Sequence, residues 1–406
     1  MKYLKQITLT PIGKNTPIAI YPRNKNLIIT GKNGSGKTTT LKTIYKTLIE
    51  KLISGDFSSE LQISERIKAY ENIEITHESH GDTYHEIISQ RERLKKLKEN
   101  NPFKFTQLKK FEHYFQNQLA VVEFFSADRQ ANITGATSAS NTSTSRTQQP
   151  RLPIENNLES SIEQHITNLY IRKAIALSFK NDTDTANSID SWLNQFERDL
   201  KHLTEDNSTE IEFDPYDFKV YIKQLNRERF TLQSISSGYS SILTIFSRLL
   251  MRAEFLQIIP SNLQGIVLID EIDVHLHVSL QKIIFPFLIN SFPNVQFIVS
   301  THSPFILTSV DDAIIFDLTT EQHEEDISSY SYESVLEGLF GVHSASQKLQ
   351  GKIKKLSDLT NSDSPQTAQI QKIVKELTPN IKQLDMESLF FFNKAVLKLT
   401  HKKSED

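Results

Sequence analysis

Residues 31–38 read Gly31-Lys32-Asn33-Gly34-Ser35-Gly36-Lys37-Thr38 and match the phosphate-loop pattern G-x-x-x-x-G-K-[ST] at every fixed position. Hydrophobic patterning predicts a strand before the loop at 27–30 and a helix after it at 37–53. In such a setting, glycines let backbone N–H groups converge on phosphates at a helix N-terminus. The alternative is a chance glycine-rich turn, which would not be expected between this strand and this helix. The stretch therefore predicts a nucleotide-binding α/β fold.

The loop residues divide into backbone donors and two side chains with separate roles. Lys37 is predicted to reach the β- and γ-phosphates of a nucleotide, and the Thr38 hydroxyl is predicted to coordinate Mg²⁺. The nucleotide-binding residues predicted here are Gly31, Lys32, Asn33, Gly34, Ser35, Gly36, Lys37, Thr38 and Thr39.

Two further groups of polar residues follow apolar strands. Asp270 and Glu271 come directly after an apolar run at 266–269, and His302 follows another at 297–300. Ligands of parallel sheets bind at the carboxyl ends of the strands. There Asp270 can hold Mg²⁺, Glu271 can polarise an attacking water, and His302 can hydrogen-bond that water or the γ-phosphate. The structural alternatives are an acidic cap for the helix predicted at 278–289 and a histidine that only supports the fold.

Composition places few limits on function. The chain has 406 residues, of which 38% are hydrophobic and 23% charged, and its net charge of −3 neither favours nor excludes a nucleic-acid partner. Because it has no cysteine, disulfide scaffolds and thiolate metal sites are excluded. No secretory signal is recognisable, and no apolar run approaches the roughly 18 residues that span a bilayer. We therefore expect a cytoplasmic protein without a membrane partner.

Changes in periodicity divide the chain into five expected segments. They are an N-terminal half of a nucleotide-binding head at 1–89 with one strand at 73–75, a helical hairpin insertion at 90–120 broken at 100–102, a strand with a flexible Ser/Thr-rich loop and a helical subdomain at 121–228, the C-terminal half of the head at 229–330, and a helical extension at 331–406. Strands that alternate with helices predict a mainly parallel, doubly wound sheet.

A third polar segment opens the helix predicted at 239–257. Ser236, Ser237 and Gly238 place two hydroxyls and a glycine at its N-terminus, where exposed N–H groups and the helix dipole attract anions. Simple N-capping of the helix by Ser237 is an equally good interpretation of this segment alone.

Taken in order, the four segments resemble the phosphate loop, signature, acidic pair and histidine of ABC-type ATPases. The run Asp270-Glu271-Ile272-Asp273-Val274-His275-Leu276-His277, followed by Ser300-Thr301-His302-Ser303-Pro304, is similar to SMC proteins, RecF, double-strand-break-repair ATPases and OLD proteins. Ser126-Ala127-Asp128-Arg129 is also similar to this group. The resemblance implies an ABC-type head that binds ATP and Mg²⁺. It further implies a homodimer or higher homo-oligomer in which Ser236, Ser237 and Gly238 act on the partner's ATP. Residues 273–275 would form the loop between the two sites, and Gln130 is a candidate for the lid glutamine.

Within this group the chain most resembles the ATPase subunits of Septu-type (PtuA-like) and PARIS-type (AriA-like) anti-phage systems. The resemblance implies ATP hydrolysis that holds or regulates a separate effector, such as a nuclease or toxin. No nuclease domain is expected in this chain, because no strand-terminal acidic pattern follows His302. The alternatives are a DNA-repair ATPase of the RecF or break-repair type and a transporter subunit, which the segment 270–277 disfavours.

Two other patterns leave open alternatives. Asp273, His275 and His277 would share a face of an extended segment and could hold zinc or manganese, although the loop between paired heads explains them without a metal. Residues 91–115 mix lysines and arginines with Phe103, Phe105, Phe111, Tyr114 and Phe115. This segment could bind nucleic acid through phosphates and stacked bases, or it could be a solvated helical hairpin with its aromatics packed inward.

Overall fold

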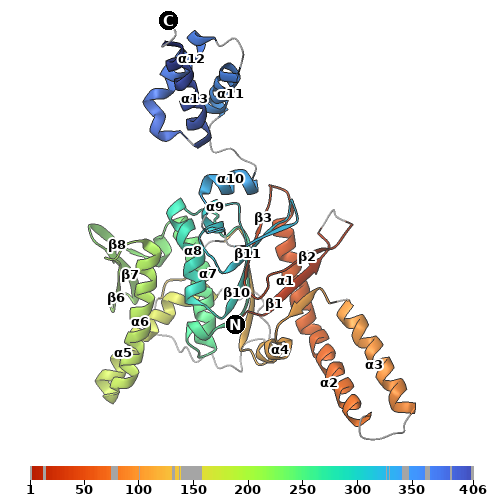
Figure 1. Cartoon of the computed structure of the whole chain (residues 1–406). Coiled ribbons are helices and arrows are strands. Elements are labelled where there is room, and N and C mark those ends of the chain that lie inside the picture. Colours follow the sequence, from red (N-terminus) through yellow and green to blue (C-terminus); the bar gives the residue numbers. More distant parts are fainter. Residues whose placement is uncertain are drawn as a thin grey trace. The chain divides into compact units, whose positions relative to one another are not determined.

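The computed structural model describes residues 2–11, 15–74, 81–99, 101–129, 133–136, 138, 158–325, 327–328, 330–340, 347–361, 366–384 and 386–403. The chain divides into two compact units, residues 1–329 and 330–406 (Figure 1). Gln130 and most of the Ser/Thr-rich loop expected before residue 150 lie outside the described residues.

A six-stranded sheet forms the centre of the first unit. Its order is β12 (Gln322–Glu325), β11 (Ala313–Asp317), β3 (Asn26–Thr30), β10 (Val295–Ser300), β9 (Gln264–Ile269) and β5 (Ala120–Phe125). All neighbours run parallel except the edge strand β12, which is antiparallel to β11. The predicted α/β fold with a mainly parallel sheet is therefore confirmed. Because the strands are parallel, the residues after β3, β9, β10 and β11 meet at one edge.

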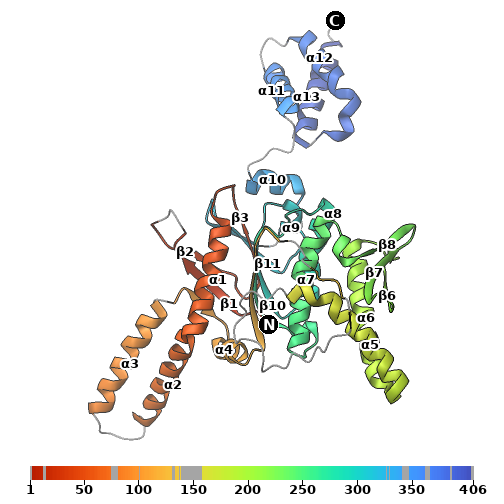
Figure 2. The ribbon, with the colours of Figure 1, turned by 180° about the vertical axis from the view of Figure 1, so that it is seen from behind.

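Helices cover both faces of this sheet. Helix α1 (Lys37–Ser54) lies on one face, whereas α7 (Ser237–Phe255) and α8 (Val278–Ser291) lie on the other (Figures 1 and 2). Leu41, Ile44 and Leu48 recur at helical spacing along α1 and are fully or almost fully buried. Burial of each such side chain stabilises the fold by about 1.5–3 kcal/mol. This packing fixes the N-terminus of α1 at the carboxyl end of β3.

A smaller antiparallel sheet completes the core on the α1 side. It consists of β2 (Ile18–Ile20), β1 (Leu4–Leu9) and β4 (Phe103–Phe105), followed by α4 (Leu108–Gln116). Its inward side chains share one hydrophobic cluster with α1 and with β3, β9, β10 and β11. The charged, helical pattern of 90–118 predicts no strand, but the aromatic side chains of Phe103 and Phe105 belong to β4.

A long helical hairpin leaves the head earlier than expected. Helices α2 (Asp56–Glu74) and α3 (Gly81–Glu99) run side by side, so the helices of the hairpin cover 56–74 and 81–99, whereas 90–120 was the expected span (Figure 1). The strand predicted at 73–75 is wrong, since residues 73 and 74 end α2. The Ile73–Ile75 pattern is locally typical of a strand, but pairing of α2 with α3 overrides that preference. The break expected at 100–102 does follow the last residue of α3.

The remaining part of the first unit holds helices and a third sheet. The helices predicted from 158 to 203 are present as a 3-10 turn η1 (Leu158–Ser161), α5 (Ile162–Ile175), a π-helical turn η2 (Ala176–Lys180) and α6 (Thr183–Thr204). The antiparallel sheet of β6 (Glu210–Asp214), β7 (Lys219–Gln224) and β8 (Arg227–Thr231) was missed. Short helical turns follow at η3 (Leu232–Ser234), η4 (Pro260–Asn262) and α9 (Pro304–Leu307).

The second unit is helical and has its own core. It contains α10 (Tyr332–Phe340), α11 (Gln347–Asn361), α12 (Thr367–Leu377), a 3-10 turn η5 (Thr378–Gln383) and α13 (Met386–Lys403). Leu356, Ile370, Phe392 and Ala395 are buried together between α11, α12 and α13. In the described part of the chain, no helix has the length and apolar character that crossing a membrane requires.

Candidate functional site

The phosphate-loop sequence forms a tight turn between β3 and α1. Gly36 precedes the first residue of α1 and has a φ of 92°, a left-handed conformation that favours glycine. Gly31 has a φ of 135°, and a Cβ there would lie only 2.9 Å from Ser35 Oγ and 3.1 Å from Asp317 Oδ1. Side chains at these positions would therefore distort the loop. The turn leaves the first N–H groups of α1 without partners in the helix, which is the arrangement that binds phosphate.

Lys37 is the charged centre of this edge. Its side chain is buried, and Nζ donates hydrogen bonds to the carbonyls of Gly31 at 3.1 Å and Lys32 at 3.2 Å. Burial lowers the pKa of Lys37, while the nearby carboxylates of Glu271, Asp270, Asp273 and Asp317 oppose that shift. The structure thus brings the loop lysine into the electric field of the acidic pair, although β3 and β9 are far apart in sequence.

The acidic pair is held by the end of β10. Asp270 is 2% exposed, and its Oδ1 accepts a hydrogen bond of 2.7 Å from Ser300 Oγ. That hydroxyl in turn accepts one of 2.7 Å from the backbone N–H of Glu271, and the N–H of Ile272 donates to the carbonyl of Ser300 at 3.0 Å. Asp270 and Glu271 therefore have fixed backbones, and neither caps α8, whose first residue is Val278.

His302 lies two residues beyond the end of β10, at the same edge. Burial lowers its pKa, the charge of Lys37 lowers it further, and the carboxylates of Asp273 and Glu271 raise it. Because the net shift is downward from 6.5, the imidazole is neutral at pH 7. Lys37, Glu271 and His302 are therefore close enough to act on one another, as the strand order predicts.

The polar atoms at this edge fit a nucleotide with its divalent cation. Ser35 Oγ is buried in the loop and has no hydrogen-bond partner, so it could donate to a phosphate oxygen. Thr38 and Asp270 supply the oxygen ligands that Mg²⁺ prefers. The residues predicted to bind phosphate and Mg²⁺ thus include donors and oxygen ligands of the required kinds, and their roles stay predictions.

The three signature residues lie at the start of α7. Ser236 precedes the first residue of α7, Ser237, and no side chain caps this helix end. Both serines are exposed, so simple N-capping does not explain them. Gly238 is buried, and a Cβ there would lie 2.9 Å from the carbonyl oxygen of His275. The glycine is thus required because the signature packs against the loop at 273–277.

The alternative metal site in that loop lacks the required geometry. Residues 271–275 form turns and not an extended segment, with His275 at a φ of 63°. Asp273 Oδ1 accepts a 2.5 Å hydrogen bond from Thr301 Oγ1, and His277 is the residue that caps α8. Among the described residues, no group of three or more His, Cys, Asp or Glu side chains could hold a metal ion.

Arg129 is a site residue to which the sequence had assigned no role. The residue is 6% exposed, and Nη1 donates to the carbonyls of Ser126 at 2.9 Å and Asp270 at 2.7 Å. Nη2 donates to the carbonyls of Glu271 at 3.0 Å and Ile272 at 3.2 Å. The available signal was an arginine that closely follows a buried strand. It joins the turn after β5 to the backbone of the acidic pair.

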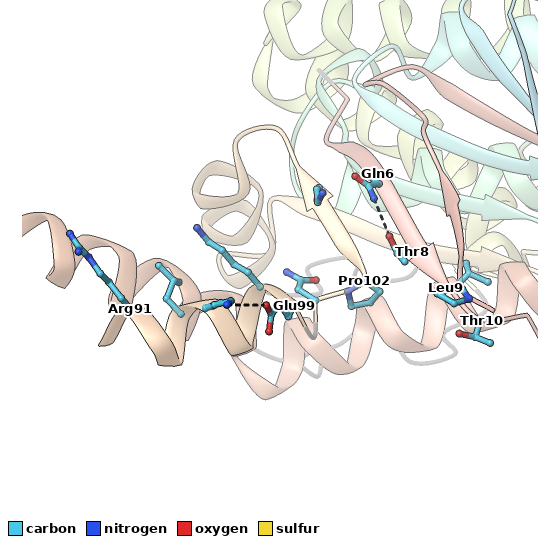
Figure 3. A pocket seen from close by; sticks show the side chains of 13 residues that line it. Gln6, Thr8, Leu9, Thr10, Arg91, Glu99 and Pro102 are labelled. Carbon is cyan, nitrogen blue, oxygen red and sulfur yellow. Dashed lines mark hydrogen bonds and ion pairs between the residues drawn. The ribbon is translucent and has the colours of Figure 1, made fainter. Parts of the chain in front are cut away.

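The aromatic residues of 91–115 pack inward in the structure, whereas the basic residues of this segment lie at the surface. Phe103 and Phe111 are buried, and Phe105, Tyr114 and Phe115 pack against the same core, so of the two alternatives for the aromatic residues the structure supports inward packing over base stacking. The charged side chains remain outside, and Arg91, Lys95, Lys98 and Lys104 line a cleft of about 760 Å³ between α3 and the sheet of β1 and β4 (Figure 3).

Comparison with protein families decides the relationship. The model of the family described as "AAA domain, putative AbiEii toxin, Type IV TA system" matches residues 27–308, which is more than half of the chain. The chain belongs to this family. The matched region of this AAA-domain protein includes the phosphate loop, the signature, the acidic pair and His302.

Three relatives of this AAA-domain protein have names that refer to retrons or to Septu. The "Retron Vc95 probable ATPase" of Vibrio cholerae serotype O1 biovar El Tor is 43% identical over 88 residues, which cover 21% of this chain and 17% of that protein. The "Retron Ec83 probable ATPase" of Escherichia coli is 37% identical over 123 residues, covering 29% and 23%. The "Septu protein PtuA" of Bacillus mycoides (strain KBAB4) is 30% identical over 151 residues, covering 35% and 21%. The predicted resemblance to Septu PtuA proteins is confirmed, and each of these three matches spans less than a quarter of the relative.

Solved structures superpose on this AAA-domain protein with low TM-scores. An SMC head bound to the C-terminal winged-helix domain of ScpA has a TM-score of 0.36 at 14% identity, over 78% of this chain and 93% of that chain. A nucleotide-free ATP-binding cassette from an ABC transporter has a TM-score of 0.32 at 12% identity, over 84% and 96%. Scores of this size establish no shared fold, so the fold assignment rests on the sheet topology and the family match.

Proposed function

We propose that this protein is a cytoplasmic ATPase subunit of an anti-phage defence system. The observation that carries the proposal is the meeting of Lys37, the acidic pair and His302 beside the phosphate loop, at one edge of a parallel sheet. The names of the retron and Septu relatives support the same activity and setting.

Each side chain at this edge can have a separate role in ATP hydrolysis. Lys37 would hold the charge of the β- and γ-phosphates, and Glu271 would take the proton of the attacking water as its oxygen bonds to the γ-phosphorus. The bond from that phosphorus to the bridging oxygen of ADP breaks in the same displacement. His302, which is neutral, would orient the water or the γ-phosphate. Mg²⁺, held by Thr38 and Asp270, would add positive charge at the phosphates.

The signature supports catalysis between two copies of the chain. Ser236 and Ser237 are exposed hydroxyls at the N-terminus of a long helix and do not cap it, so they are available to a phosphate from outside. Gly238 fixes them beside the loop at 273–277. We therefore propose a head-to-head homodimer or higher homo-oligomer in which each signature completes the ATP site of its partner.

A mixture of two inactive variants tests this arrangement. Ser237→Arg should bind ATP in an isolated head but block hydrolysis, because the bulky side chain fills the space meant for the partner's γ-phosphate. Lys37→Ala should fail to bind ATP. A mixed dimer keeps one composite site with an intact loop and an intact signature, so mixing should restore a clear fraction of the wild-type rate. Mixed dimers that form without any recovered turnover would contradict action between copies.

We assign the effector activity of the defence system to another polypeptide. Metal-dependent cleavage of a phosphodiester uses a cluster of metal-binding side chains, and among the described residues no group of three or more His, Cys, Asp or Glu side chains could hold a metal ion. We propose that ATP turnover holds or regulates a separate effector such as a nuclease or toxin. Nuclease activity of the purified chain alone would contradict this division of labour.

The basic cleft favours a second candidate function, contact with nucleic acid. Arg91, Lys95 and Lys98 recur at helical spacing along α3. They line the cleft together with Lys104 of β4 and with Gln6 and Thr8 of β1 (Figure 3). The one acidic residue of the lining, Glu99, lies 3.9 Å from Lys95, so a net positive charge remains. Such a charge would attract a phosphate backbone.

Charge reversal in the cleft tests this contact. The double substitution Lys95→Glu and Lys98→Glu should weaken binding of duplex DNA by about tenfold or more and reduce its salt dependence by about two phosphate contacts. Lys354→Glu with Lys355→Glu on α11, two lysines that are also exposed, is the matched control. Equal affinity in both double variants, measured by fluorescence anisotropy over a salt series, would exclude the cleft as the binding site.

A further inference from the structure

Glu271 has a backbone conformation that a glutamate rarely adopts. Its φ is 45°, in the left-handed region that disfavours residues other than glycine. Such a conformation persists only where neighbouring groups hold it. Two groups do so here, since the Glu271 N–H donates to Ser300 Oγ and the Glu271 carbonyl accepts from Arg129.

Arg129 contacts backbone where comparable arginines contact carboxylates. Arg248 donates to Glu159 at 2.7 and 2.8 Å, and Arg252 donates to Glu123 at 2.7 Å, so each forms an ion pair. The guanidinium of Arg129 instead spans the carbonyls of three consecutive residues, 270–272, and of Ser126. Its planar fork of donors suits this arrangement, which a lysine ammonium cannot reproduce.

Arg129 can remain positively charged although it is buried beside the acidic pair. Burial lowers its pKa to about 10, and the carboxylates of Asp273, Asp270 and Glu271 oppose the shift. The side chain therefore stays cationic at neutral pH. A buried cation is tolerated when it is hydrogen-bonded and lies in the field of opposite charges. Both conditions hold beside the acidic pair.

We propose that Arg129 is a positioning residue that sets the orientation of Glu271 for hydrolysis and does not itself contact ATP. By its bond to the carbonyl of Ser126, it makes that orientation depend on the turn that follows β5. The inference rests on the proposed function, because it assigns Glu271 the role of base. It predicts a defect in the hydrolysis step with ATP binding preserved.

Two substitutions at Arg129 and one elsewhere test the proposal. Arg129→Lys keeps the charge but loses the fork, and Arg129→Gln is neutral and retains two donors. Arg252→Lys is the matched control, because it alters a partly buried arginine whose partner, Glu123, lies within β5. For each variant, ATP affinity, kcat and the melting temperature are measured. Both Arg129 variants should lower kcat by about tenfold or more, whereas ATP affinity should stay within about threefold of wild type. The control should change kcat by less than about twofold.

A double-variant cycle separates positioning from general damage. If Arg129 acts through Glu271, then Arg129→Lys should not slow hydrolysis further in a Glu271→Gln background. A residue that only supports the fold would lower the residual rate of Glu271→Gln as much as that of the wild type.

Several outcomes would overturn the proposal. They are an unchanged kcat in both Arg129 variants, additive losses in the double variant, a loss of ATP affinity that matches the loss of kcat, and failure of both Arg129 variants to fold while Arg252→Lys folds. A wild-type protein that binds ATP without hydrolysing it would instead refute the proposed function itself. The two failures are therefore distinguishable.

Discussion

Replacing Glu271 by glutamine is expected to slow ATP hydrolysis by about a hundredfold or more, because positioned general bases contribute about 10²- to 10⁴-fold. ATP affinity should be nearly unchanged, since Lys37, Thr38 and Asp270 remain. The backbone bonds from Ser300 and Arg129 to residue 271 do not involve the lost carboxylate, so the substitution should leave the fold intact. The variant should then accumulate as ATP-bound dimers, because the ATP between the two heads is not hydrolysed.

The measurement combines steady-state phosphate release with size-exclusion chromatography in the presence of ATP and Mg²⁺. Glu228→Gln on β8, an exposed glutamate in the third sheet, is the control for loss of a carboxylate. Turnover of Glu271→Gln at the wild-type rate would show that Glu271 is not the base. A loss of ATP binding in this variant would assign Glu271 to the binding step.

Replacing Lys37 by alanine should have the largest effect on ATP binding. The substitution removes a buried cation whose charge-assisted hydrogen bonds to phosphate are each worth about 1.5–3 kcal/mol. Losing two of them predicts that affinity falls by about a hundredfold or more. The substitution also removes the positive charge that lies near the carboxylates of Asp270, Glu271, Asp273 and Asp317. Without it, these negative charges would repel the phosphates of ATP.

Equilibrium binding of a fluorescent ATP analogue, with the melting temperature recorded alongside, checks this expectation. Lys42→Ala serves as the control, because Lys42 is an exposed lysine on the same helix, α1. A variant Lys37→Ala that is folded and binds ATP as tightly as Lys42→Ala would remove the basis for the phosphate-loop assignment.

The parts of the fold that the sequence predicts correctly are those with strong local signals. The strand before the loop, helix α1, the strands that end at Asp270 and near His302, and helix α8 all have continuous apolar runs or clear helical spacing. The hairpin of α2 and α3 has few apolar residues at regular spacing, and its boundaries depend on how the two helices pair. The sheet of β6, β7 and β8 did have a local signal in its alternation of apolar and polar residues, with a turn at Asn226, where φ is 59°.

The candidate site was predictable to the extent that it follows from strand order. The carboxyl ends of parallel strands must share an edge, so Lys37, Asp270, Glu271 and His302 could be placed together from sequence. The role of Arg129 could not, because its four acceptors are backbone carbonyls and backbone atoms leave no trace in a sequence pattern. Likewise, packing of Gly238 against His275 depends on the angle at which α7 meets the loop.

Single-turnover hydrolysis shows whether the edge that holds Lys37, Glu271 and His302 cleaves ATP. The purified chain, in excess over γ-labelled ATP and with Mg²⁺ present, is mixed and quenched at intervals, and labelled phosphate is separated from ATP. Wild-type protein should convert the ATP it binds to ADP and phosphate, whereas Glu271→Gln should retain it as ATP for at least about a hundredfold longer. Wild-type protein that binds the labelled ATP and releases it unhydrolysed, as single chains and as assembled oligomers alike, would contradict the account.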